Sequence, residues 1–477
     1  MARIIPPLDL MWFVIETPAS PTHVGALLLF EKPKGRPGVV REIVEAYRAY
    51  QPTPPFNFVP SLGGPGIPRF HEATHYDPHY HIQHIALPAA ASYDDLLRLV
   101  ADLSEPMLDR SRPLFRDWFI DNVPGNRFAV YAKVHHSITD GISGTKSLYA
   151  SLSSNRRRGI RTPAFAAEQP VQRPKPPKAL TDRLADLGIM ATRQTRAIRD
   201  VSVTALKKGL GTLLGAEPVG SMPFTAHHAP MNAPVQMARS IATLSLPLEE
   251  MHAVARHFGA TLNDLAVTLV DEGTHRYLNG TGRSFPQRLV AFCPVSLRGA
   301  GDDGSGTKVS AVFVHLGRHD ATVVERIAEV VSAMSAAKQE MRSMSKDAAM
   351  TYAVALLGTA ELTAATRVDR LTPPLANLVI SNVPGARERM YLNGAALVDI
   401  YPTSAIAMSV GLNATLTSYH DRMDFGFVGN SIAMQGLPAL ASHVGAAYQE
   451  LKAEVSPRRA PRRAPRRRRP SRPAANG

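Results

Sequence analysis

The sequence predicts an α/β protein made of two lobes, each a mixed sheet with helices, with a cleft between them. Three observations support this class. Apolar residues recur at both strand and helical spacing in each half of the chain. A segment rich in proline and arginine, 155–178, separates the two halves. The length of 477 residues suits two or three domains, at roughly 100–200 residues per domain.

In the first half, strand-like and helix-like segments alternate. The run "VGALLLF" (24–30) predicts a short buried strand. The β-rich segments 114–120 and 127–134 flank the turn-like "DNVPGN", which predicts a hairpin whose second strand delivers His135 and His136. Helical spacing of apolar residues predicts three helices, at 38–50, 93–108 and 142–154.

The second half begins near residue 235 and has the same mixed character without a visible sequence repeat. Helices are expected at 248–278 with a turn at Gly259, as a pair over 321–366, and at 437–453. Strands are expected at 288–297, at 309–316, at 376–385 where the strand ends in a turn, and as an antiparallel hairpin over 407–430. The shared character of the halves predicts two similarly built lobes.

These patterns divide the chain into four parts. They are an N-terminal lobe (1–154), a basic linker with an amphipathic helix (155–234), a C-terminal lobe (235–455) and an arginine- and proline-rich tail (456–477). In 180–214, apolar residues recur at helical spacing and Arg and Lys supply the other face. Such a helix packs on its own protein with a solvated basic face, or lies on a membrane.

Most of the basic character belongs to the tail. The net charge is +14, but 456–477 holds nine arginines, five prolines and no acidic residue, so the remainder carries 45 − 40 = +5. A tail without large apolar residues does not fold alone, and we expect disorder. It is then either simply solvated or attracted to anionic lipid headgroups, at about 1 kcal/mol per basic residue. Nucleic acid is a third possibility, disfavoured because no aromatic residue is interleaved with the arginines.

Composition excludes several classes of protein. The single cysteine, Cys293, rules out an intramolecular disulfide framework and a cysteine-rich zinc site, and it suits a reducing cytosol. The sequence contains no window of about 18 consecutive apolar residues, so we predict no transmembrane helix. The N-terminal segment carries Asp9 and Glu16 and lacks a continuous apolar stretch, so we expect mature protein instead of a signal peptide.

The segment "HHSITDG", residues 135–141, carries the most informative chemistry. An imidazole takes a proton from a hydroxyl near neutral pH when its second nitrogen is held and substrate can reach the ring. Strand alternation sends His135 and His136 to opposite sides, so that one can face the cleft and the other the lobe interior. Asp140 could hold the base, or hold the loop by pairing with a distant arginine. Gly141 permits a tight turn and close approach of substrate.

A metal site is disfavoured in this segment, because adjacent strand histidines point apart and no third ligand lies nearby. A bare pair of histidines is usually structural. The full string H-H-x-x-x-D-G at a strand-to-turn boundary favours a catalytic base.

The string matches the HHxxxDG motif of CoA- and carrier-dependent acyltransferases. That superfamily includes chloramphenicol acetyltransferase, condensation domains of peptide synthetases and bacterial wax ester synthase/diacylglycerol acyltransferases. Further blocks resemble the last of these families: "PPLDLMWFVIETPASPTHVGALLLFE" (6–31), "SRPLF" (111–115), "ATLNDLAVTLV" (260–270), "CPVSLR" (293–298) and "ISNVPG" (380–385). The resemblance spans roughly residues 6 to 452. It implies two chloramphenicol-acetyltransferase-like lobes with the active-site cleft between them.

The resemblance implies transfer of a long-chain acyl group from acyl-CoA to an alcohol. His136 would be the general base that deprotonates the acceptor hydroxyl, and His135 a supporting residue. Asp140 would be structural, next to Gly141, and we hypothesise that it pairs with Arg298 across the lobes. The alternative is that Arg298 is a surface cation or contacts CoA. No acyl-enzyme is required, so the cysteine need not act as a nucleophile.

The remaining blocks supply supporting and binding residues. Asn263 could orient the base or stabilise the oxyanion. Asp264 matches the same block, or is a helix-start acid favoured by the helix dipole. The substrate-binding residues implied by the resemblance are Pro113, Leu114, Phe115, Ser381 and Asn382. The chain departs from the family at Phe115, where Trp is usual, and in "GTKVS" (306–310), which leaves substrate preference open.

The implied co-substrate is acyl-CoA, with no metal and no permanently bound cofactor. The acceptor is diacylglycerol or a long-chain alcohol, and the sequence does not rank them. Diacylglycerol lies in a membrane or lipid droplet, so we expect a cytoplasmic protein that contacts such a surface peripherally. Two alternatives stay open: the same fold with a polyketide or amine acceptor, and a non-catalytic protein that binds lipid surfaces. The complete His136, Asp140 and Gly141 set argues against the second.

Overall fold

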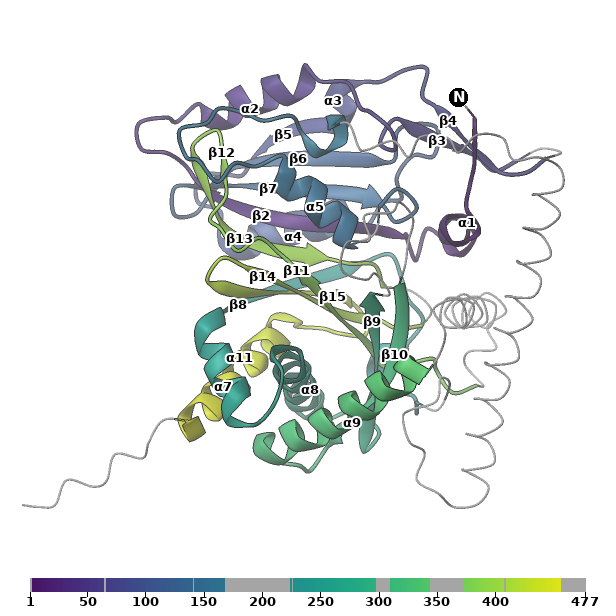
Figure 1. Cartoon of the computed structure of the whole chain (residues 1–477), viewed down its shortest axis with the longest axis vertical. Helices are drawn as coiled ribbons and strands as arrows, with labels where there is room; N and C mark the ends of the chain where they lie inside the picture. The colour runs from purple at the N-terminus through teal and green to yellow at the C-terminus, as the bar shows by residue number, and fades with distance from the viewer. Residues whose placement is uncertain are drawn as a thin grey trace, which may run out of the picture.

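The computed structural model describes residues 2–63, 66–139, 141–167, 224, 226–296, 309–343, 372–406 and 409–455. The predicted amphipathic segment 180–214 and the tail 456–477 lie outside these residues. The described chain forms two lobes, each around a six-stranded sheet (Figure 1). The mixed α/β character predicted from the sequence is therefore confirmed.

The sheet of the first lobe has the order β12-β13-β2-β7-β6-β5. Its strands are β12 (Tyr391–Leu392), β13 (Ala395–Thr403), β2 (His23–Glu31), β7 (Arg127–His135), β6 (Phe115–Val123) and β5 (Ile82–Ala86). The predicted hairpin is confirmed, because β6 and β7 pair antiparallel with Phe115 opposite Val134. A small sheet of β1 (Arg3–Ile4), β4 (Arg69–Glu72) and β3 (Phe58–Ser61) lies at the margin of this lobe.

Helices cover both faces of the first sheet. They are α1 (Pro7–Ile15), α2 (Val39–Arg48), α3 (Pro78–His81), α4 (Tyr93–Ser104), α5 (Gly141–Ala150) and the 3-10 turn η1 (Ala164–Ala166). Strand β2 is apolar on both sides because Leu28 and Phe30 join the core with α2, while Leu27 and Leu29 join the core with α4. Helix α4 ends earlier than the sequence suggested, since Pro106 cannot continue it.

The second sheet has the order β10-β9-β11-β14-β15-β8. Its strands are β10 (Val309–Arg318), β9 (Arg288–Ser296), β11 (Leu378–Pro384), β14 (Leu412–Tyr419), β15 (Arg422–Asn430) and β8 (Arg239–Pro247). The face away from the first lobe carries α7 (Leu248–His257), α8 (Leu262–Thr281), α9 (Val323–Ser343) and α11 (Pro438–Val455), and the turn η2 (Pro230–Asn232) precedes β8 (Figure 1). Gly259, at φ 64°, makes the predicted turn before α8. Of the two helices expected over 321–366, α9 is described and 344–366 is not.

Strand β13 comes from the second half of the chain but pairs with β2 of the first sheet, with Tyr401 opposite Leu27. It also contacts the second sheet, where the Ile400 N–H donates to the Asp424 carboxylate at 2.9 Å. Gly426 permits this crossing, because a Cβ there would collide with the carbonyl oxygen of Pro402. The sequence patterns predicted no strand here. The predicted lobe boundary at 235 stays a prediction, and β12 and β13 lie beyond it in sequence.

None of the described helices is long and apolar enough to cross a membrane.

Candidate active site

The paired histidines lie where β7 ends, between the two strands that flank it. The His135 N–H donates to the Leu114 carbonyl at 3.0 Å, and the His136 N–H donates to the Thr22 carbonyl at 2.9 Å. The Ile138 N–H then donates to the His135 carbonyl, which closes a turn. Backbone hydrogen bonds to neighbouring segments therefore fix both histidines, independently of the contacts that their rings make.

The His135 ring is fully buried and held on both nitrogens. The Ser137 N–H donates to Nδ1 at 3.2 Å, so the ring proton lies on Nε2. That nitrogen lies 3.2 Å from the Thr22 hydroxyl oxygen, which itself donates to the Trp12 carbonyl. It also lies 3.4 Å from a Glu16 carboxylate oxygen. A ring without access to the cleft can position its neighbour but cannot contact a substrate.

The buried Glu16 and His135 and the half-buried Arg110 form a group that we call the first-lobe ion cluster. Arg110 donates to the Glu16 carboxylate from Nη2 at 2.8 Å and from Nε at 3.2 Å. Burial alone would raise the pKa of Glu16, but the contacts of its carboxylate with the His135 ring, the Arg110 guanidinium and the Thr22 N–H outweigh burial and lower the pKa. Glu16 is therefore an anion at neutral pH and holds His135 in one tautomer.

The His136 residue, unlike His135, is only half-buried. It stacks on the Trp12 indole with 3.9 Å between ring centroids and 13° between planes. One residue along helix α1, Phe13 stacks on His135 at 4.4 Å and 14°. A single short helix thus clamps both imidazoles, each against its own aromatic ring.

Sequence reasoning did not assign roles to Trp12, Phe13, Glu16 or Arg110. The opening block was recognised as a resemblance only, and Arg110 precedes the "SRPLF" block by one residue. The available signal was the apolar run of α1 followed at once by an acidic residue. Nothing in that spacing indicates that α1 returns to the end of β7.

The partner predicted for Asp140 was Arg298, and both residues lie outside the described part of the chain. Gly141 is described as the first residue of α5. A Cβ at this position would lie 3.4 Å from the Val383 side chain of β11, which belongs to the second sheet. The glycine of the motif therefore lies where the two lobes meet.

The "PLF" residues lie beside the histidines at the start of β6. Leu114 is buried against Phe13, and its carbonyl accepts the His135 N–H. Phe115 stacks on His81 and Phe165 at centroid distances of 4.7 and 5.0 Å. Pro113 is buried before the strand, with its carbonyl accepting the Phe115 N–H at 2.9 Å. Of these three predicted substrate-binding residues, Phe115 alone lines the cavity described below.

In the second lobe, the predicted residues separate into a structural acid and a polar pair. Asp264 accepts from the Thr261 N–H at 3.0 Å in the capping box of α8 and pairs with Lys338 at 3.2 Å. Asn263 accepts from the Asn382 amide at 3.2 Å, so two of the predicted blocks touch. Ser381 is half-buried on β11, and neither it nor Asn382 lines the cavity, whereas Val383 does.

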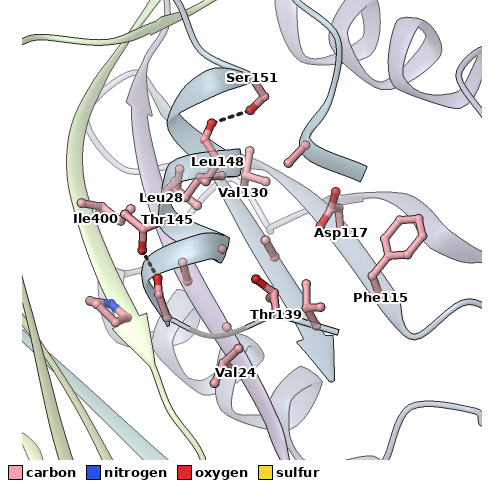
Figure 2. A pocket seen from close by; sticks show the side chains of 18 of the residues that line it. Val24, Leu28, Phe115, Asp117, Val130, Thr139, Thr145, Leu148, Ser151 and Ile400 are labelled. Atoms are coloured by element: carbon pink, nitrogen blue, oxygen red, sulfur yellow. Dashed lines mark hydrogen bonds between the residues drawn. The ribbon is translucent and has the colours of Figure 1, made fainter. Parts of the chain in front are cut away.

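An apolar cavity of about 160 Å³ lies under α5 in the first lobe (Figure 2). Its floor is one face of the sheet and includes Val24, Leu28, Val130 and Phe115. Its roof is one face of α5, whose Gly141, Gly144, Thr145 and Leu148 follow helical spacing. None of the α5 residues is fully buried, as expected for a helix laid over a hollow. The cavity therefore starts at the histidine motif and runs into the lobe.

The described residues support neither a nucleophilic cysteine nor a metal site. Burial raises the pKa of the Cys293 thiol to about 12, so this residue of β9 stays a protonated, apolar side chain near neutral pH. No cluster of three or more His, Cys, Asp or Glu side chains in the described ranges could hold a metal ion.

Comparison with known proteins identifies the family. The wax ester synthase/diacylglycerol acyltransferase catalytic domain matches residues 5–266, and the C-terminal domain of the same family matches 305–452. The probable diacylglycerol O-acyltransferase Tgs4 of Mycobacterium tuberculosis is 32% identical over 460 residues, covering 94% of this chain and 96% of that protein. The O-acyltransferase WSD of Acinetobacter baylyi is 29% identical over 450 residues, covering 93% and 95%.

Solved structures agree. The wax ester synthase/diacylglycerol acyltransferase from Marinobacter aquaeolei VT8 superposes with a TM-score of 0.74 at 27% identity, covering 95% of this chain and 99% of that one. The first condensation domain of the CDA synthetase, at 18% identity and a TM-score of 0.56, shares the fold. The two-lobed fold predicted from the sequence is thereby confirmed, and with both domains matched along the chain, this protein belongs to the wax ester synthase/diacylglycerol acyltransferase family.

Proposed function

We propose that this protein transfers a long-chain fatty acyl group from acyl-CoA to diacylglycerol, forming triacylglycerol, and that long-chain alcohols serve as a second acceptor class, giving wax esters. The observation that carries the proposal is the asymmetry of the histidine pair beside an apolar cavity. The His135 ring is sealed and held by the first-lobe ion cluster, while the His136 ring is half-buried, and Thr139 and Gly141 of the same motif line the cavity.

His136 is the general base in this proposal. It removes the proton from the acceptor hydroxyl, and the oxygen attacks the thioester carbonyl carbon. The carbon–sulfur bond of the tetrahedral intermediate then breaks, and the departing CoA sulfur takes up the proton from His136. Each step is balanced without an acyl-enzyme, which agrees with the buried and protonated state of Cys293.

The indole of Trp12 favours this role because it fixes the plane of the His136 ring. The cavity under α5 holds an alkyl chain, since its lining is predominantly apolar and it adjoins Gly141 of the motif. Phe115 forms part of its wall, in line with the substrate-binding role expected for the "PLF" block.

The second lobe contributes polar groups to the transition state. Because the Asn263 oxygen accepts from Asn382, the Asn263 amide N–H₂ group is the donor left for an oxyanion. The pairing of Asp140 with Arg298 is retained in the proposal as the tie between the motif loop and the second lobe.

Diacylglycerol is dissolved in membranes and droplets, so the proposal includes a cytoplasmic enzyme in peripheral contact with such a surface. The basic tail 456–477 and segment 180–214 are the proposed contacts, through attraction of arginine and lysine to anionic headgroups. Deleting 456–477 should weaken sedimentation with anionic liposomes at low salt and have little effect at high salt. Equal binding by both proteins would remove the tail from the proposal.

The deciding experiment is product analysis with labelled palmitoyl-CoA. Diacylglycerol, hexadecanol and a long-chain amine are supplied in parallel, and products are separated by thin-layer chromatography and mass spectrometry. Triacylglycerol should be the main product and wax ester the second. Exclusive acylation of the amine, or no lipid product from folded protein, would contradict the proposal.

A further inference from the structure

The cavity under α5 has a defined direction across the sheet. Its floor is a row of residues directly opposite one another on four strands: Pro402 on β13, Ala26 on β2, Ala132 on β7 and Asp117 on β6. All four line the cavity. Three strand spacings separate the ends of the row, about 14 Å. The row is therefore long enough to support a substantial part of an extended alkyl chain.

The floor is deepest along this row, because the two alanines in its middle have small side chains. The adjacent row on the same face carries Val24, Val134 and Phe115, and the row on its other side carries Leu28 and Val130. These larger side chains stand higher than the two alanines between them. A chain that lies in the hollow is thus guided along the row and toward its β6 end.

The two ends of the row differ in their surroundings. At the β13 end the lining includes Val383, Thr415 and Thr417, which belong to the second sheet. This end lies at the lobe interface with Gly141 of the motif. At the β6 end the lining is closed by Phe115 and Phe165, whose rings stack at 5.0 Å.

Asp117 is an acidic residue at this closed and otherwise aromatic end of the cavity. Its carboxyl group faces the cavity beside Phe115 (Figure 2). Within the described ranges, no hydrogen bond or ion pair to this carboxyl group is found, and burial is the sole cause that raises its pKa, to about 7. The Asp117 side chain is half-buried and open to the hollow, so an apolar chain that fills the hollow would desolvate the carboxyl group without giving it a partner, at a cost in free energy.

Two neutral polar residues lie near Asp117. The Tyr47 hydroxyl is close enough for the Asp117 charge to contribute, after burial, to raising the pKa of Tyr47, and Ser151 lies near the same hydroxyl. Both Tyr47 and Ser151 line the cavity, and the Ser151 hydroxyl donates to the Leu148 carbonyl at 2.6 Å. The closed end therefore carries one acidic and two hydroxyl side chains in otherwise aromatic and aliphatic walls.

We infer that the cavity selects an alkyl chain bearing a hydroxyl group along its length, and that the Asp117 carboxyl group hydrogen-bonds to that hydroxyl. A hydroxyl is the matching group because it can donate to the carboxylate and also accept from the protonated acid. An unsubstituted chain would leave the carboxyl group desolvated and unpaired. The inference rests on the proposed acyl transfer for the identity of the chain, which belongs either to the acyl donor or to the acceptor alcohol.

The test compares chains that differ by one oxygen. One arm supplies CoA thioesters of a single chain length, unsubstituted or with one hydroxyl group at successive carbons, to a fixed acceptor. The other arm supplies palmitoyl-CoA with hexadecanol or with diols of the same length. We expect one positional isomer to exceed the unsubstituted chain in kcat/KM by at least about tenfold. The arm in which this occurs identifies which chain occupies the cavity.

Two substitutions assign the preference to the carboxyl group. Asp117→Leu should reduce the preference for the hydroxylated chain to within about twofold and improve use of the unsubstituted chain. Asp117→Asn retains an accepting oxygen and should keep most of the preference. Asp102→Asn removes a carboxylate from the exposed face of α4 and should change nothing. Thermal melting of each variant verifies that it is folded.

Binding provides a readout that does not depend on turnover. Thioether analogues of the same acyl-CoAs, with and without the hydroxyl group, are titrated by calorimetry into wild type and Asp117→Leu. If no pair of substrates gives transfer, the proposed function fails, while a hydroxyl preference in binding that Asp117→Leu removes still supports the inference. If neither turnover nor binding distinguishes hydroxylated from unsubstituted chains, or if Asp117→Leu keeps the preference, the inference is overturned.

Discussion

Each lobe contains a buried cluster of charged side chains, and the two clusters serve different ends. In the first lobe, Glu16 joins Arg110 to the His135 ring. In the second lobe, Arg326 donates to Asp271 at 3.1 Å and to Glu272 at 2.6 Å. We call the latter the second-lobe ion cluster, and it also includes His275 and Arg276.

The difference lies in what adjoins each cluster. The second-lobe ion cluster ties α8 to α9 and to β10, whose Gly317 N–H donates to Asp271 at 2.8 Å. The printed side-chain contacts of this cluster stay within α8 or lead to α9, α11 and β10. The first-lobe ion cluster ends instead at the His135 imidazole, whose neighbour along the chain is the half-buried His136. We infer that buried charge indicates a candidate functional site where the network adjoins the histidine motif, and a structural role where it joins helices and strands.

The largest effect should come from the accessible group itself. His136→Ala is expected to lower kcat by about 10²- to 10⁴-fold, the usual contribution of a general base, with little change in melting temperature. The matched control is His252→Ala, which removes an exposed histidine from α7. Initial rates with palmitoyl-CoA measure both. Near-normal turnover by His136→Ala would end its assignment as the base.

The next largest effect should come from Glu16→Gln, which leaves Arg110 and His135 without their anion. Turnover should fall on the order of ten- to a hundredfold, because the His135 ring next to the proposed base His136 loses its fixed orientation. The free energy of unfolding should drop by about 1–3 kcal/mol at pH 7. Glu45→Gln, which removes an exposed partner of Arg48, is the control and should change neither quantity appreciably.

The stability difference for Glu16→Gln should also depend on pH. Because the folded protein lowers the pKa of Glu16 below its unfolded value, ionised Glu16 stabilises the fold at pH above the unfolded pKa. That stabilisation is lost as the pH falls through the folded pKa. Urea unfolding of wild type and Glu16→Gln at pH 7 and below pH 4 measures this. A difference that grows toward acid would contradict the ionised state of Glu16.

A smaller effect is expected from Trp12→Leu, which removes the ring stacked on His136. Loss of an aromatic stack of this kind corresponds to about a two- to tenfold decrease in kcat. Trp12→Phe keeps an aromatic face and should recover most of the activity. Identical rates for the two variants would show that the stack does not orient the base.

The smallest effect on turnover should come from the second-lobe ion cluster. Arg326→Met removes the buried cation between Asp271 and Glu272, which keep only the Gly317 N–H, His275 and Arg276 as partners, so the free energy of unfolding should fall by about 3–5 kcal/mol. Turnover at a temperature where the variant is folded should stay within about twofold of wild type, as expected for a cluster whose contacts are all structural. The exposed Arg98→Met is the stability control. A selective loss of kcat in Arg326→Met would break the comparison between the lobes.

Much of the fold followed from local pattern. A continuous apolar run predicted β2, β-rich runs predicted β6 and β7, and helical spacing predicted α2 and the start of α4, because each of these elements buries one or both faces in a core. Strand β13 was missed because its residues follow no clear alternation and because its partners, β2 and the second sheet, lie far away in sequence. Local pattern carries no information about such a partner.

The candidate site likewise has a part that the sequence predicted and a part that only the structure shows. The string of residues 135–141 predicts which side chains carry the chemistry, because adjacent imidazoles at the end of a strand point to opposite sides. Only the tertiary structure decided that α1 returns to cover both rings, that Glu16 and Arg110 hold the inner one, and that Asp117 faces the cavity. Sequence spacing specifies neighbours along one strand or helix, whereas these contacts depend on how separate elements pack against one another.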